Sequence, residues 1–150
     1  STTISQSLDD ECLVCASKEA RQYLFNITNS LGNSEALDQL KRSFLFNIDS
    51  LVSLIETTGG NRTFVVTGDL HGMWIRDSAA QMEPYLHVGG ECLYRVLLGV
   101  INSHAFYLLQ NGYANSFMPT PRWNWTESQQ RDAHAGYIHS FWYEVDSCAY

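Results

Sequence analysis

The most informative stretch of this chain is Thr67-Gly68-Asp69-Leu70-His71-Gly72-Met73-Trp74-Ile75-Arg76-Asp77-Ser78-Ala79-Ala80-Gln81. Within nine positions it holds a Trp, an Arg and two Asp, between a strand-like run and a short helix. This mixture does not suit a core segment, because buried charges are costly unless they are paired or hydrogen-bonded. The stretch therefore predicts a polar ligand site where the strand meets the helix.

The residue types in this stretch suit a polyhydroxylated, neutral ligand. The flat face of Trp74 can cover the apolar C–H face of a sugar ring. Asp69 and Asp77 can accept hydrogen bonds from paired hydroxyls, and Arg76 can donate from a rigid fork. The alternative is a structural ion pair of Arg76 with Asp77 or Asp69, with Trp74 in the core.

Three ordered segments of the chain resemble one enzyme family. Residues 62–86, RTFVVTGDLHGMWIRDSAAQMEPYL, closely resemble the signature of glycoside hydrolase family 125, the exo-α-1,6-mannosidases. Residues 112–117, GYANSF, are similar to the family's PYANAF, and residues 143–147, YEVDS, are similar to its YEIDS. The resemblance covers residues 36–150, whereas residues 1–35 carry none and read as an unassigned helix.

The resemblance implies a mostly α fold, the N-terminal part of an (α/α)6 barrel, so that residues 1–150 would be an incomplete domain. It implies release of terminal mannose from α-1,6-linked glycans with inversion. The catalytic acid and base are expected beyond residue 150, and the partner is a mannose-containing glycan. The substrate-binding residues expected here are Asp69, Trp74, Arg76, Asp77, Tyr113, Asn115 and Asp146.

Two departures from the family pattern keep alternatives open. Asn111 and Gly112 stand where the family has Asp-Pro, which removes a carboxylate and a rigid turn. Residues 139–142, HSFW, replace a charged WERK run. One alternative is a non-catalytic or vestigial carbohydrate-binding protein, and another is a different (α/α)6 glycosidase that acts on glucosides.

Composition excludes several classes. Hydrophobic residues make up 45% of the chain and aromatic residues 13%, which indicates a packed core. The net charge of −7 disfavours nucleic acid, since phosphate binding needs clustered Lys and Arg. No uninterrupted apolar run reaches the roughly 18–20 residues that span a bilayer. The oligomeric state cannot be read from these properties.

Neither a cofactor nor a metal is expected. The chain has no Gly-rich phosphate loop after a strand, and its five histidines lack the spacing of a metal motif. Cys12-x-x-Cys15 is half a zinc motif without a second half, so we interpret it as structural. With Cys92 and Cys148 it allows three disulfide connectivities. Glycosylation motifs begin at Asn26, Asn61 and Asn124, which favours the secretory pathway or an extracellular location.

Apolar spacing predicts the regular elements. We expect helices over residues 8–31, 35–57 and 91–110, the second capped by Ser34 and the third apolar nearly all round. A short strand is expected at Thr63–Val66 and a helix over 78–86, bent or ended by Pro84. In the first helix, the stripe expected to be buried is Leu13, Ala16, Ala20, Leu24, Ile27 and Leu31.

The C-terminal part of the sequence is more irregular. Residues 112–136 read as a loop, and its aromatic residues suggest a binding wall: Tyr113, Phe117, Trp123 and Trp125. Residues 137–150 are aromatic and read either as a strand or as the start of another helix.

Overall fold

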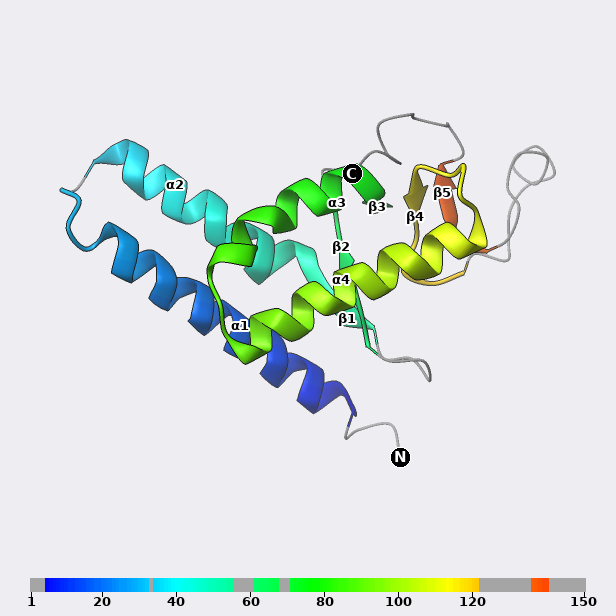
Figure 1. Cartoon of the computed structure of the whole chain (residues 1–150), viewed down its shortest axis with the longest axis horizontal. Helices are drawn as coiled ribbons and strands as arrows, with labels where there is room; N and C mark the ends of the chain where they lie inside the picture. Colours follow the sequence, from blue (N-terminus) through cyan, green and yellow to red (C-terminus); the bar gives the residue numbers. More distant parts are fainter. Residues whose placement is uncertain (1–4, 33, 56–60, 68–70, 122–135, 141–150) are drawn as a thin grey trace.

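The computed structural model of the chain describes residues 5–32, 34–55, 61–67, 71–121 and 136–140. The fold is mostly helical, as predicted. The helix α4 runs through the middle of the molecule, with α1 and α2 at one end and three short strands at the other (Figure 1). The elements in order are α1 (Ser5–Thr28), α2 (Glu35–Phe46), the π-helical turn η1 (Asn47–Leu51), β1 (Val52–Ile55), β2 (Arg62–Val65), β3 (Met73–Trp74), α3 (Ile75–Met82), the 3-10 turn η2 (Glu83–His87), α4 (Glu91–Gln110), β4 (Ser116–Phe117) and β5 (Ile138–Ser140).

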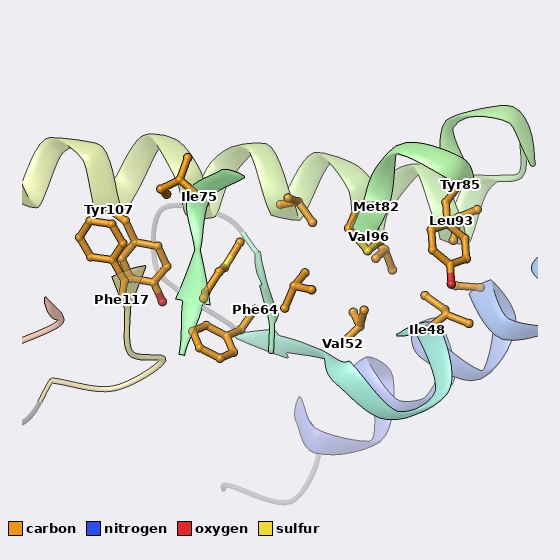
Figure 2. Packing of buried hydrophobic residues seen from close by; sticks show 14 of the residues in the cluster. Ile48, Val52, Phe64, Ile75, Met82, Tyr85, Leu93, Val96, Tyr107 and Phe117 are labelled. Atoms are coloured by element: carbon orange, nitrogen blue, oxygen red, sulfur yellow. The ribbon is translucent and has the colours of Figure 1, made fainter. Parts of the chain in front are cut away.

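The helix predicted over residues 91–110 is confirmed as α4, and one side of it forms the centre of the core. It packs against β2 and α1. Figure 2 shows its buried side chains Val96 and Tyr107 facing Phe64 and Phe117 from the strands. The opposite side is open in the described part of the chain, where Ile101 and Leu109 are exposed. By length and composition alone α4 is apolar enough to cross a membrane, which is weak evidence because core helices pass the same test.

The closest packing in the fold joins α4 to β2. The hydroxyl of Thr63 donates to the carbonyl of Val96 at 2.8 Å, and the hydroxyl of Ser103 donates to the carbonyl of Thr63 at 2.7 Å. Gly99 lies between them, and a Cβ there would sit 2.2 Å from the Thr63 hydroxyl oxygen. The missing side chain of Gly99 therefore permits a hydrogen-bonded contact between helix and strand. The strand predicted at Thr63–Val66 is confirmed as β2, one residue earlier in the sequence, and all four of its residues are buried.

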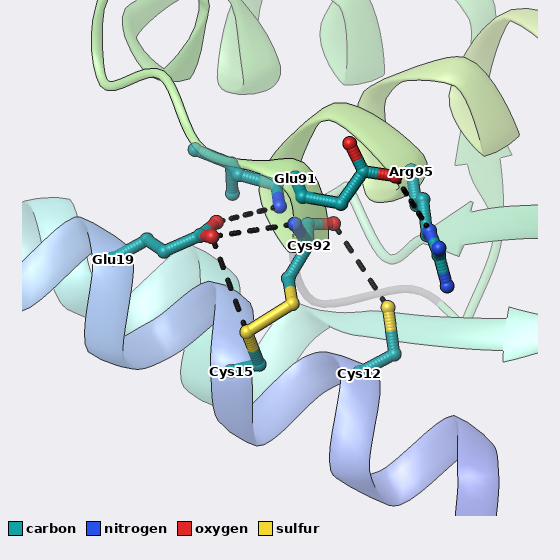
Figure 3. Close-up of a disulfide and its surroundings, with 7 residues drawn as sticks. Cys12, Cys15, Glu19, Glu91, Cys92 and Arg95 are labelled. Atoms are coloured by element: carbon teal, nitrogen blue, oxygen red, sulfur yellow. Dashed lines mark hydrogen bonds and ion pairs between the residues drawn. A yellow bond between two sulfur atoms is a disulfide. The ribbon is translucent and has the colours of Figure 1, made fainter.

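A disulfide ties α1 to the start of α4 (Figure 3). It joins Cys15 to Cys92, which selects among the connectivities that the sequence left open and makes Cys15 structural, as predicted. Beside it the carboxylate of Glu19 accepts hydrogen bonds from the backbone N–H groups of Cys92 at 3.3 Å and Leu93 at 2.8 Å. These amides belong to the first turn of α4, where an acceptor with negative charge is favourable.

The predicted buried stripe of α1 is only partly correct. Ala16, Ala20 and Leu24 are buried, as expected. Ile27 and Leu31 are exposed, at 47% and 55%. The helix ends at Thr28 rather than at residue 31, so the last stripe position is no longer in helical register.

The helix predicted over residues 35–57 is wrong in its second half. Ser34 caps α2 as predicted, accepting from the N–H of Leu37 at 3.2 Å. After Phe46 the chain passes through η1 and becomes β1, which pairs antiparallel with β2 from Val52↔Val65 to Ile55↔Arg62. Helical spacing of the apolar residues continues through β1, but Val and Ile also suit strands, and the pairing partner decides between the two.

The short helix after the site stretch also begins and ends differently from the prediction. α3 begins at Ile75 instead of residue 78 and ends at Met82, and Pro84 then lies in η2. Tyr85 of η2 is buried, and its hydroxyl donates to the carbonyl of Phe44. Burial raises the pKa of Tyr85 to about 12, so this hydroxyl stays protonated and η2 stays joined to α2.

We expect Gly99→Ala to destabilise the intact protein by about 1–3 kcal/mol, because the added methyl group overlaps Thr63 and overpacks the contact. The cost of the overlap outweighs the gain in helix propensity from Gly to Ala, which is about 1 kcal/mol. Chemical denaturation measures the change. Gly32→Ala is the matched control, since a Cβ at Gly32 meets nothing within 4 Å. An unchanged midpoint for Gly99→Ala would show that the α4–β2 contact is looser than described.

We expect the double variant Cys15→Ser/Cys92→Ser to lose about 2–4 kcal/mol of stability, because the disulfide closes a long loop. The two cysteines are 77 residues apart in sequence. The thermal midpoint of the intact protein with and without reductant measures the effect. The reductant should lower the wild-type midpoint towards that of the variant, and equal midpoints without reductant would contradict the prediction.

Candidate functional site

A three-stranded sheet gathers segments that are far apart in the sequence. β4 lies in the middle and pairs antiparallel with β3 on one side and β5 on the other. Trp74 is opposite Ser116, and Ser116 is opposite Ser140. The site stretch and the segment resembling PYANAF, which the sequence predicted separately, are therefore neighbours.

Trp74 is held at the junction of β3 and α3. Its backbone N–H donates to the hydroxyl of Thr67 at 3.1 Å, and that hydroxyl donates to the carbonyl of Gly72 at 3.2 Å. The half-buried indole lies against His139, with ring centroids 5.2 Å apart and planes inclined at 59°. The interpretation of Trp74 as a core residue does not fit this position, because the residue is only partly buried.

Gly72 makes room for the two rings. A Cβ there would lie 2.9 Å from a ring carbon of Trp74 and 3.2 Å from the imidazole of His139. His139 Nδ1 in turn lies 3.3 Å from the hydroxyl of Ser116, within hydrogen-bond reach. The sequence showed His139 only as a departure from the family pattern, and strand pairing alone reveals it as part of the site.

Arg76 and Asp77 form the ion pair that the alternative interpretation expected. Arg76 Nε donates to Asp77 Oδ1 at 3.1 Å. The side chains are 31% and 40% exposed, so the pair adds little to stability. Asp77 lies in the first turn of α3, where the helix dipole favours a carboxylate. The arrangement keeps an oriented carboxylate accessible to a ligand beside Trp74.

The segment from residue 111 to 117 divides into surface and core. The side-chain oxygen of Asn111 accepts from the N–H of Tyr113 at 2.8 Å, so the turn keeps an acceptor without the family's Asp-Pro. Tyr113 is 68% exposed, as a binding wall requires. Phe117, expected in that wall, is instead fully buried and stacked on Tyr107 at 4.7 Å between centroids.

Asn115 joins the three strands to α3. Its N–H donates to the carbonyl of Ser140 and its carbonyl accepts from the N–H of Ile75, both at 3.3 Å. The side chain is buried, and its Oδ1 has no hydrogen-bond partner in the part of the chain that the structure describes. Buried acceptors are normally satisfied, and because this oxygen has almost no exposed surface, a ligand would reach it only after the surrounding side chains move.

Several predicted residues lie outside the described ranges: Asp69, Trp123, Asn124, Trp125, Tyr143, Glu144, Asp146 and Cys148. Their predicted roles stay predictions. Of the glycosylation motifs, Asn26 and Asn61 are exposed. The threonine hydroxyls of these motifs are buried and bonded, Thr28 to the carbonyl of Leu24 and Thr63 to that of Val96. Glycans at Asn26 or Asn61 would therefore have to be attached before the chain folds.

One group within the described residues has the composition of a metal site: Cys15, Glu19 and Cys92. The disulfide uses both sulfur atoms, and the carboxylate of Glu19 is bound by the amides of α4. Metal ligation requires free thiolates, so this group does not hold an ion while the disulfide is formed.

A groove lies between α3, η2 and α4. Its volume is about 380 Å³. Glu83 and His104 line it together with apolar side chains: Ala79, Ala80, Met82, Leu86, Leu97, Val100 and Ile101. Burial lowers the pKa of His104 to about 4, so its imidazole is neutral at physiological pH. Sugars need several polar partners, so this groove does not suit the ligand that Trp74 and Asp77 suit.

Comparison with known proteins agrees with the resemblance. A family model described as metal-independent alpha-mannosidase (GH125) matches residues 33–150. The meiotically up-regulated gene 157 protein of Schizosaccharomyces pombe is 30% identical over 111 residues, which cover 72% of this chain and 22% of that protein.

A solved structure from Streptococcus pneumoniae is also similar, with 31% identity and a TM-score of 0.65. It is described as a metal-independent alpha mannosidase in a non-productive substrate complex with alpha-1,6-mannobiose. The match covers 98% of this chain and 31% of that one, so this chain spans less than a third of either relative.

We expect Gly72→Ala to displace Trp74 from His139 and to destabilise the intact protein by about 1–3 kcal/mol, because the new methyl group overlaps both rings. A crystal structure of the variant measures the ring displacement, and denaturation measures the stability. Gly112→Ala is the control on the neighbouring segment, where the nearest atom to an added Cβ is the carbonyl oxygen of Leu108 at 3.8 Å. Unmoved rings in Gly72→Ala would refute the close packing.

Proposed function

Since this chain belongs to the GH125 family of metal-independent alpha-mannosidases, we propose that it supplies part of the sugar-binding site of a glycoside hydrolase. The reaction is the release of terminal mannose from α-1,6-linked glycans with inversion. The observation that carries the proposal is the junction at which β3, β4 and β5 bring Trp74, Asp77 and Asn115 together. The α-1,6-mannobiose bound to the Streptococcus relative supports the choice of linkage.

Each of the described side chains has a different role in binding a mannose ring. Trp74 covers the C–H face of the sugar, which is apolar and flat. Asp77 accepts hydrogen bonds from neighbouring hydroxyls, and Arg76 fixes the orientation of that carboxylate through its Nε–H. Asn115 joins the strands to α3 through its backbone and so helps to position Trp74 and Asp77. These contacts orient the sugar before the glycosidic bond is broken.

The bond cleavage itself needs two carboxyl groups on opposite sides of the sugar. In an inverting glycosidase one protonates the leaving oxygen and the other activates water, with about 6.5–9.5 Å between them. Asp77 is committed to Arg76, so we assign it to binding. We propose that the acid and the base come from segments outside this chain, and that the helices described here complete an (α/α)6 barrel with those segments. The small share of the Streptococcus relative that this chain covers supports the proposal.

We also propose that the protein enters the secretory pathway or is extracellular. The protein has a disulfide, Cys15–Cys92, and disulfides persist in oxidising compartments. The exposed asparagines of two glycosylation motifs are compatible with this route.

We expect Trp74→Ala in the intact protein to raise the KM for α-1,6-mannobiose by about tenfold or more, because the ring face loses its cover. Asp77→Asn should have a similar effect, since an amide is a weaker acceptor than a carboxylate. Phe25→Ala is the control, an aromatic residue that is 60% exposed on α1, away from the site. Unchanged KM values in both site variants would contradict the assignment.

The reaction and its substrate are tested on the wild-type intact protein. NMR of the fresh product should show β-mannose from α-1,6-mannobiose, the sign of inversion, and no cleavage of the matched α-1,6-linked glucose disaccharide. Binding of mannobiose without cleavage would favour the non-catalytic alternative. Preferred cleavage of the glucose disaccharide would favour the glucosidase alternative.

A further inference from the structure

The hydroxyl of Ser78 is completely buried between three polar atoms. Its Oγ lies 2.6 Å from the carbonyl of Trp74, 3.1 Å from that of Ile75 and 2.8 Å from Nε2 of His104. The carbonyls can only accept hydrogen bonds, so the single hydroxyl proton is directed to the backbone of α3. Nε2 of His104 must therefore carry a proton and donate it to Ser78 Oγ. This fixes the imidazole tautomer with the proton on Nε2.

This proton arrangement excludes a nucleophilic role for the pair. A serine within hydrogen-bond reach of a histidine is also the arrangement of a nucleophile and its base. A base, however, must present an unprotonated nitrogen to the hydroxyl, and Nε2 here is the donor. The Ser78 side chain is also inaccessible, at 0% exposure. The pair is therefore a hydrogen-bonded link between α4 and α3.

The link ends at the backbone of the sugar-binding residues. Trp74 is the N-cap of α3, and its backbone is fixed on both sides, through its N–H by Thr67 and through its carbonyl by Ser78. The peptide group after Trp74 joins the residue that carries the indole to the first turn of α3, where Asp77 lies, so a shift of this group would change the position of Asp77 relative to Trp74. The residue that fixes the Ser78 hydroxyl thus influences the orientation of the site.

We propose that His104 is a positioning residue of the saccharide site, which acts through Ser78 on the carbonyl of Trp74 without touching the sugar. The proposal rests on the proposed function of that site. His104 is on α4 and faces the apolar groove between α3 and α4, where Glu83 is the only other titratable side chain that lines it among the described residues. No cation lines that groove among the described residues, and burial lowers the pKa of the imidazole, so the neutral donor form is the favoured one.

The test compares His104→Leu with His104→Gln in the intact protein. Leucine keeps an apolar side chain at this position but cannot donate, whereas the amide of glutamine retains a donor. We expect His104→Leu to lower kcat/KM for α-1,6-mannobiose by about tenfold, because a small displacement of binding groups is costly. His104→Gln should stay within about threefold of wild type. Leu97→Ala is the control, a groove residue whose loss affects packing without affecting the link.

A second variant keeps the test decisive if His104→Leu does not fold. Ser78→Ala removes one hydroxyl and leaves the side chains that line the groove unchanged. It should lower kcat/KM as His104→Leu does, and the double variant should be no worse than the poorer single one, since both break the same link. Additive losses, an unrescued His104→Gln, or unchanged kcat/KM in a folded Ser78→Ala or His104→Leu would overturn the positioning role alone. A wild-type protein that neither binds nor cleaves mannobiose would overturn the proposed function and this inference with it.

Discussion

The close approach of α4 to β2 is the constraint on which the rest of the structure depends. A helix and a strand can come this near only where one of them lacks a side chain, and Gly99 provides that position. The approach allows Thr63 and Ser103 to exchange hydrogen bonds with the opposite backbone in a fully buried place. Unsatisfied polar groups would be costly there, so the register of helix against strand has one favourable solution.

Once that register is set, the successive turns of α4 reach the other parts of the fold. Its first turn is capped by Glu19 and joined to α1 by the disulfide. His104 reaches α3 through Ser78, and the hydroxyl of Tyr107 donates to the carbonyl of Met118 beyond β4 at 3.0 Å. The residues of the proposed sugar site are thus held by contacts with α4, which fix the geometry of Trp74 at the end of β3 and of Asp77 in α3.

Buried polar groups in this protein fix the relative positions of helices and strands as well as stabilising the fold. Arg62 on β2 is buried with its guanidinium carbon 3.7 Å from the centre of the Phe106 ring, and two of its nitrogens lack hydrogen-bond partners in the described part of the chain. The ring offers the cation a favourable electrostatic surface in place of water. Beside it, the aromatic residues Tyr107 and Phe117 stack and join α4 to β4. The strands that carry the site are consequently fixed to the same helix as α3.

The sequence by itself determined the family and the extent of α4, because the family motifs are local in sequence and the spacing of apolar residues reports a helix directly. The mixture of Trp, Arg and Asp predicted a ligand site at Trp74 and Asp77, and this assignment stays a prediction. Tertiary structure alone decided that residues 52–55 form a strand and that Phe117 belongs to the core. It also decided that His139 lies against Trp74. Each of these depends on a partner distant in the chain, and local patterns carry no information about which partner a segment meets.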